Sequence, residues 1–139
     1  MLGRLHVQLD NLVVIVTLLA LLVYGWTGMR TGAARHKYGV TAPAVTGAPE
    51  FERTYRAQMN TLEWLPLFLP SLWLFAWYWN GKVAAAIGLV WILARIYYAV
   101  TYVKDPAKRG PGFGLQALAT AVLLFGALGK AVYLAVTGG

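Results

Sequence analysis

The sequence predicts an all-α integral membrane protein in which one domain, residues 1–139, forms a bundle of four transmembrane helices. Hydrophobic residues make up 59% of the chain, and its mean hydropathy is +0.58. Only 12% of the residues are charged, about half the share that soluble domains carry. A soluble domain of this length could not bury so much apolar surface, so we expect lipid to be its solvent.

Four stretches of the sequence reach the roughly 20 mostly apolar residues that a helix needs to cross a bilayer. We expect these helices at about residues 11–29, 57–79, 83–103 and 113–136. The second helix should begin before the membrane, because residues 50–56 also have a helical pattern. Pro66 and Pro70 lie inside it, and each removes a backbone donor and should bend the helix.

The net charge of +7 comes from basic residues that lie in the gaps between the apolar stretches. Two gaps, residues 30–56 and 104–112, hold most of them, namely Arg30, Arg35, Lys37, Arg53, Arg56, Lys104, Lys108 and Arg109. Because Lys and Arg mark cytoplasmic loops, we predict that both gaps face the cytoplasm. Both termini, whose tails carry only Arg4 and Lys130, then lie on the far side. A bacterial inner membrane and the endoplasmic reticulum both fit this orientation.

The same pattern argues against nucleic-acid binding, because the charges do not form a stripe along a soluble face. The chain contains no cysteine. This excludes disulfides, thiolate metal sites and a cysteine nucleophile, and we expect no metal. Any thiol chemistry would require a thiol from another molecule.

The second helix carries polar residues on one face. Arg53, Arg56, Asn60 and Glu63 are spaced three, four and three residues apart, which aligns them along an α-helix. A carboxylate within an apolar stretch is costly and usually faces the bundle interior with a partner. Glu63 is therefore a candidate ligand-binding residue or one half of a salt bridge between helices.

The third helix also carries polar residues on one face. Arg95, Tyr98 and Tyr102 again share one face, with Arg95 as the natural structural partner of Glu63. The tyrosines either bind a ligand or belong to the interfacial aromatic belt. Arg109 lies just before the fourth helix, whose N-terminus favours anions, and it would otherwise be solvated or bind lipid phosphate.

Together these residues predict a pocket at the cytoplasmic membrane boundary with several guanidinium groups, one carboxylate, an amide and two phenols. Arginines bind carboxylates bidentately, and a glutamate binds an ammonium group. A small zwitterion with more than one carboxylate suits this pocket, and glutathione has that inventory. Glutathione also carries the thiol that the protein lacks.

Residues 51–66, FERTYRAQMNTLEWLP, resemble the signature E-R-x-x-R-A-x-x-N-x-x-E of the MAPEG superfamily, the membrane-associated proteins in eicosanoid and glutathione metabolism. The similarity extends from about residue 32 to residue 115 and is greatest to the branch of the leukotriene C synthases and type-2 microsomal glutathione transferases. It implies a homotrimer of four-helix subunits that binds glutathione between neighbouring subunits on the cytoplasmic side.

The resemblance also implies roles for individual residues. The glutathione-contacting positions match Arg56, Asn60, Glu63, Tyr98 and Tyr102. Contacts from the adjacent subunit match Arg35 and Gln58, and the arginine that stabilises the glutathione thiolate matches Arg109. Arg53 matches the signature as a structural or binding residue.

Two positions depart from that branch. His36 stands where the branch has a second arginine, once proposed as a proton donor, so the role of this position is open. Trp64 replaces a tyrosine near the glutathione and keeps the aromatic contact without the phenolic hydrogen bond. Non-enzymic members of the superfamily lack the residues that match Arg56 and Glu63, so their presence favours an enzyme.

The sequence thus predicts a membrane-bound glutathione transferase acting on lipophilic electrophiles, with reduction of lipid hydroperoxides as a second activity of the same thiolate. A non-enzymic lipid-binding scaffold of the same fold is the alternative. A small multidrug transporter also has four helices and an intramembrane glutamate, but it should lack an arginine cluster beside that glutamate. The spacing of Arg53, Arg56 and Asn60 counts against it.

Overall fold

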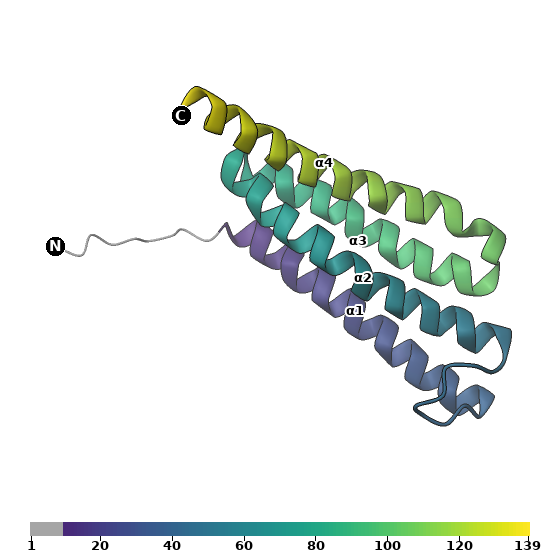
Figure 1. Cartoon of the computed structure of the whole chain (residues 1–139). Helices are drawn as coiled ribbons and strands as arrows, with labels where there is room; N and C mark the ends of the chain where they lie inside the picture. Colours follow the sequence, from purple (N-terminus) through teal and green to yellow (C-terminus); the bar gives the residue numbers. More distant parts are fainter. Residues whose placement is uncertain (1–9) are drawn as a thin grey trace.

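The computed structural model describes residues 10–139, which form four long α-helices joined by short connections (Figure 1). The elements are α1 (Asn11–Tyr38), α2 (Pro49–Tyr78), α3 (Gly81–Lys104), the 3-10 helix η1 (Pro106–Lys108) and α4 (Arg109–Thr137). No strand occurs within these residues, so the predicted all-α, four-helix fold is confirmed. Arg4, expected in the N-terminal tail, lies outside the described residues.

The helices extend beyond the apolar stretches that revealed them. α2 begins at Pro49, so residues 50–56 are helical, as their pattern indicated. α1, however, continues to Tyr38 rather than ending near residue 29, and α4 begins at Arg109 rather than near residue 113. Hydropathy detects only the lipid-facing part of a helix, so these polar turns escaped it. α1 ends at Gly39, whose φ of 67° is the left-handed conformation that glycine adopts without strain.

Three of the described helical segments are long and apolar enough to cross a membrane, namely α1, α3 and the segment that includes α4. α2 does not meet this measure, because Glu63, two prolines and several Trp and Tyr residues lower the mean hydropathy of even its most apolar part. It nevertheless contacts all three other helices, and it continues as one α-helix through Pro66 and Pro70. That α2 also crosses the membrane stays a prediction.

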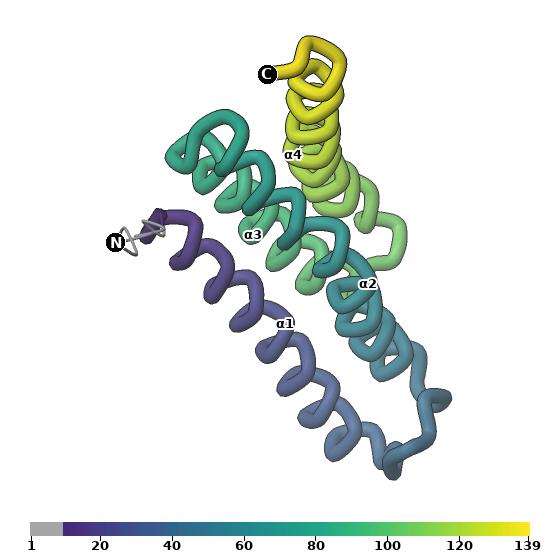
Figure 2. Tube along the Cα trace, turned by 60° about the vertical axis from the view of Figure 1, so that its left-hand side comes forward, coloured from purple at the N-terminus to yellow at the C-terminus, as the bar shows by residue number. Residues whose placement is uncertain are grey.

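α2 and α3 form the centre of the bundle, and α1 and α4 lie on either side of them (Figure 2). The rings of Phe68 and Trp91 stack in the core with centroids 4.1 Å apart. Gly88 permits a close approach nearby, since an added Cβ would lie 2.6 Å from Cγ1 of Val16. Large apolar side chains on the outer faces of α1 and α4 are exposed, as expected for contact with lipid or with another copy of the chain.

One end of the bundle collects most of the basic residues. The α1–α2 connection and η1 lie at this end, whereas the α2–α3 turn lies at the other, near the C-terminus (Figure 1). Arg30 of α1 and Arg53 of α2 both reach the last turns of α3 here. We call this the basic end; its cytoplasmic orientation stays a prediction.

Candidate functional site

Arg95 is fully buried between α2 and α3. Its Nη1 donates to Oδ1 of Asn60 at 2.8 Å, and its Nη2 donates to Oγ1 of Thr61 at 2.6 Å. Of the two alternatives for Glu63, the salt bridge to Arg95 is the one that the structure contradicts, because Glu63 is exposed and forms no ion pair among residues 10–139. Arg95 therefore fixes α2 against α3, and Glu63 remains available to a ligand.

An aromatic cluster continues from Arg95 toward the basic end. The guanidinium of Arg95 lies 4.7 Å from the ring centroid of Tyr98, which is buried and stacks on Tyr102 at 5.4 Å. The ring of Phe113 in α4 lies 6.1 Å from that of Tyr98, and it meets Trp64 of α2 edge to face at 5.5 Å. These contacts join α2, α3 and α4 at one level.

Phe113 also positions Arg109. The guanidinium of Arg109 lies 5.5 Å from the Phe113 ring centroid, a cation-π contact across one helical turn. In the sequence, Phe113 marked only the expected start of the fourth helix, and this role was not predicted. Its position four residues after the arginine was the signal, since residues i and i+4 share a helix face.

The start of α4 lies against the backbone of α3 because of Gly112. A Cβ at this position would lie 2.9 Å from the backbone N of Tyr98 and 3.0 Å from its Cα. Only glycine fits such a contact, because backbone atoms cannot move aside as a flexible side chain can. Gly112 thereby holds the first turn of α4, and with it Arg109, next to Tyr98.

The charged residues of this site point outward. Arg56 and Glu63 of α2 and Arg109 of α4 are exposed, and the charges of both arginines act on Tyr98. The resulting surface, which we call the α2–α4 face, consists of Arg56, Asn60, Glu63, Trp64, Tyr98, Tyr102, Arg109 and Phe113. It offers guanidinium groups for carboxylates or a thiolate, and a carboxylate for an ammonium group.

Other expected site residues lie elsewhere in a single chain. Gln58 and Asn60 are two residues apart, so their side chains point to nearly opposite sides of α2. The amide of Gln58 lies beside Gly28 of α1, where its Nε2 is 3.4 Å from the position of an added Cβ. Arg35 of α1 donates from Nη1 to the carbonyl of Ala44 at 2.6 Å. His36 is exposed on α1, away from the α2–α4 face.

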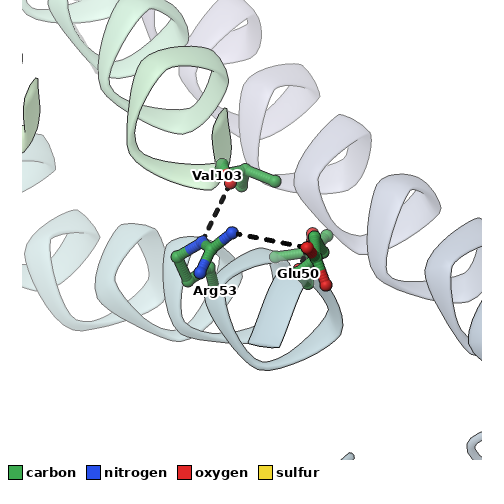
Figure 3. Close-up of polar contacts among 4 residues, drawn as sticks. Glu50, Arg53 and Val103 are labelled. Carbon is green, nitrogen blue, oxygen red and sulfur yellow. Dashed lines mark hydrogen bonds and ion pairs between the residues drawn. The ribbon is translucent and has the colours of Figure 1, made fainter. Parts of the chain in front are cut away.

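Arg53 also has a separate environment. Its Nε donates to the carbonyl oxygen of Val103 at 2.9 Å, and its Nη2 lies 4.0 Å from Oε1 of Glu50. Figure 3 shows the guanidinium between these two oxygens. The Val103 carbonyl belongs to the last turn of α3, where helical carbonyls have no partner within the helix. Arg53 thus ties the beginning of α2 to the end of α3.

The described residues contain no group of three or more His, Cys, Asp or Glu side chains that could hold a metal ion.

Gln116 of α4 is buried like Arg95, but its Oε1 and Nε2 find no partner within residues 10–139. No role was predicted for Gln116 from the sequence, because a single amide in an apolar stretch forms no pattern with other polar residues.

A model of the MAPEG family matches residues 13–129, which is most of the chain. The protein belongs to the MAPEG family. This MAPEG protein is 48% identical over 114 residues to an uncharacterized protein of Synechocystis, covering 82% of this chain and 83% of that protein. It is 44% identical to human microsomal glutathione S-transferase 2 over 84% of this chain and 80% of the relative. It is 40% identical to bovine leukotriene C4 synthase over 68% and 63% of the respective chains.

Proposed function

We propose that this MAPEG protein is a membrane-bound glutathione transferase that conjugates the glutathione thiolate to lipophilic electrophiles. The observation that carries the proposal is the α2–α4 face, where Arg56, Glu63 and Arg109 have no ion-pair partner among the described residues. Two relatives at 40% identity or more are a microsomal glutathione S-transferase and a leukotriene C4 synthase. The charges of this face and the activities named for these relatives together support the proposal.

Glutathione fits the face by charge. Its two carboxylates pair with the guanidinium of Arg56 and with that of Arg35 from a neighbouring copy, and its ammonium group pairs with Glu63. Asn60 is already an acceptor for Arg95, so its remaining amide hydrogens are free to donate to the ligand. The stacked rings of Tyr98 and Tyr102, and the ring of Trp64 held edge to face by Phe113, supply aromatic surface beside it.

Arg109 is the catalytic residue of the proposal. The thiolate is the nucleophile, and a thiol of ordinary pKa is mostly protonated at neutral pH. A guanidinium at the first residue of α4 adds its charge to that of the helix N-terminus, and both favour an anion. The thiol proton leaves to water, since the α2–α4 face includes no side chain suited to act as a base. The thiolate sulfur then forms the new bond to the electrophile as its leaving group departs.

The complete site forms between copies of the chain in a homotrimer. Gln58 and Arg35 lie on the α1 side of the subunit and cannot reach a ligand on the α2–α4 face of the same chain. A neighbouring copy that packs its α1 side against this face would bring them there. The exposed apolar side chains of α1 and α4 suit such packing, and they would also guide an oily substrate from the bilayer.

The decisive experiment assays the purified protein with glutathione and two second substrates. One is the aryl halide chlorodinitrobenzene, and the other is a fatty-acid hydroperoxide. We expect conjugation of the first, and reduction of the second would add peroxidase activity from the same thiolate. Both activities should disappear in Glu63→Ala and Arg56→Ala proteins. Tight lipid binding with no turnover of either substrate would favour the non-enzymic scaffold.

A further inference from the structure

A second charged site lies at the basic end, between α1, α2 and α3. It is an open pocket of about 450 Å³ whose polar lining includes four cationic side chains and one carboxylate. These are Arg30 and Lys37 of α1, Glu50 and Arg53 of α2, and Lys104 of α3. The excess of positive charge fits an anion.

The two arginines are held in place by α3. Arg30 donates from Nη1 to the carbonyl of Ala99 at 3.0 Å, and Arg53 donates to the carbonyl of Val103. Each bond uses one of the five N–H groups of a guanidinium. These two bonds account for the positions of Arg30 and Arg53, but they do not involve Lys37 or Lys104. Both lysines line the same pocket without a hydrogen bond in the part of the chain that the structure describes.

An apolar groove continues from this pocket along the seam between α1 and α3. The groove has a volume of about 300 Å³ and is lined by Leu19, Leu22, Val23, Trp26, Ile92 and Ile96. Arg30 joins it to the basic pocket, because its guanidinium lies 5.0 Å from the Trp26 ring centroid. From Leu19 to Arg30 an α-helix rises about 16 Å, roughly half the hydrocarbon thickness of a bilayer. The groove and the basic pocket together therefore span about the depth of one leaflet.

We propose that this seam binds an anionic glycerophospholipid of the leaflet at the basic end, with its phosphate in the basic pocket and an acyl chain in the groove. A free phosphate would leave the groove unused, and an uncharged lipid would leave Arg30, Lys37 and Lys104 without an anionic partner. Basic pockets between transmembrane helices bind anionic head groups in this way. The seam lies on the α1 side of α3, whereas Tyr98 and Phe113 of the α2–α4 face meet on its α4 side, so the two sites are separate.

The test measures lipid binding to the full-length protein in an uncharged detergent by native mass spectrometry. The probes are dioctanoyl phosphatidylglycerol, dioctanoyl phosphatidylcholine and glycerol 3-phosphate. We expect phosphatidylglycerol to bind most tightly. The double variant Lys37→Gln/Lys104→Gln should weaken its binding about 30-fold, since each basic residue near a lipid head group contributes to affinity. Leu22→Trp, which adds bulk in the groove, should also weaken it.

The matched control is Lys82→Gln/Lys130→Gln, which removes the same charge at the opposite end of the bundle. It should leave phosphatidylglycerol binding within about twofold of the parent value. Equal losses in both double variants would overturn the proposal, because they would indicate attraction by net charge alone. Unchanged phosphatidylglycerol binding in Lys37→Gln/Lys104→Gln protein would also overturn the proposal. Glycerol 3-phosphate binding as tightly as the lipid would replace it with a site for soluble phosphate.

Discussion

Nη1 of Arg95 donates to Oδ1 of Asn60 at 2.8 Å, so a fully buried cation on α3 orients a side chain on the ligand-facing side of α2. The same guanidinium bonds to Thr61 and lies over the ring of Tyr98. One arginine thus connects the packing of the central helices to two residues of the proposed glutathione site.

Arg95→Lys tests this connection. A lysine keeps the charge but lacks the planar fork, so it cannot bond to Asn60 and Thr61 together. Leaving buried polar groups without partners costs about 1–3 kcal/mol, and we expect a clear fall in Tm. Glutathione should also bind more weakly, because Asn60 loses its orientation. Arg56→Lys is the control for stability, since Arg56 is exposed and its Tm should not change. An Arg95→Lys protein with the parent Tm would contradict the structural role.

Arg95 and Glu63 show which features of the site could be predicted from the sequence and which could not. Helical periodicity identified the polar face of α2, and that face does meet α3. It could not choose the partner of Arg95, because Asn60 and Glu63 are one turn apart on the same face. Burial decided between them. Arg95 needs acceptors inside the bundle, where Asn60 and Thr61 lie, whereas the Glu63 carboxylate lies at the exposed edge.

Arg109→Ala tests the thiolate step. We expect kcat for conjugation to fall by about 10²–10³, the usual loss when one anion-stabilising donor is removed. The dissociation constant of glutathione should change little, because the carboxylates and ammonium group keep their partners. The ultraviolet absorbance of the bound thiolate should disappear with the activity. Lys108→Ala removes a neighbouring charge as the control and should retain most turnover. Full activity in Arg109→Ala protein would exclude Arg109 as the catalytic residue.

Gly112→Ala tests the close approach of α4 to α3. The added methyl group would overlap the backbone of Tyr98, so the first turn of α4 must move outward and carry Arg109 with it. We expect a lower Tm and a loss of turnover larger than the loss of glutathione binding. Gly129→Ala is the matched control, because an added Cβ there meets nothing within 4 Å in the single chain. It should be neutral or stabilising, since alanine is the better helix former. Equal effects of the two changes would contradict this role of Gly112.

The positioning roles of Gly112 and Phe113 could not be predicted from the sequence, and the reason is the same for both. A lone glycine or phenylalanine in an apolar helix has many explanations, and the decisive facts are contacts between α3 and α4. The polar residues were easier to identify, because each is costly in lipid and therefore needs a reason. Sequence analysis thus identified the charged side chains of the α2–α4 face and missed the groups that position them.

Gln116→Met tests the cost of the buried amide in α4. Neither amide atom has a partner among the described residues, so a methionine of similar length should remove a desolvation penalty. We expect the Tm to rise or stay constant. Thr120→Val is the contrasting change one turn away, because the Thr120 hydroxyl donates to the carbonyl of Gln116 at 2.9 Å. Losing that bond should cost about 1 kcal/mol. A marked fall in Tm for Gln116→Met would indicate that the amide is paired in the assembled protein.

Mixed assemblies test whether the glutathione site forms between copies. One chain carries Arg56→Ala and should be inactive alone, and the other carries Gln58→Ala and should be weakly active alone. If one subunit supplies Arg56 and its neighbour supplies Gln58, a site is intact whenever a Gln58→Ala chain offers its α2–α4 face to an Arg56→Ala chain. Random mixing in a closed ring then restores about a quarter of the parent activity. As a control, Arg56→Ala mixed with Glu63→Ala should restore no activity, because both residues lie on the α2–α4 face of one chain and every face in the mixture lacks one of them. No recovery in the first mixture, with proven co-assembly, would place the whole site within one subunit.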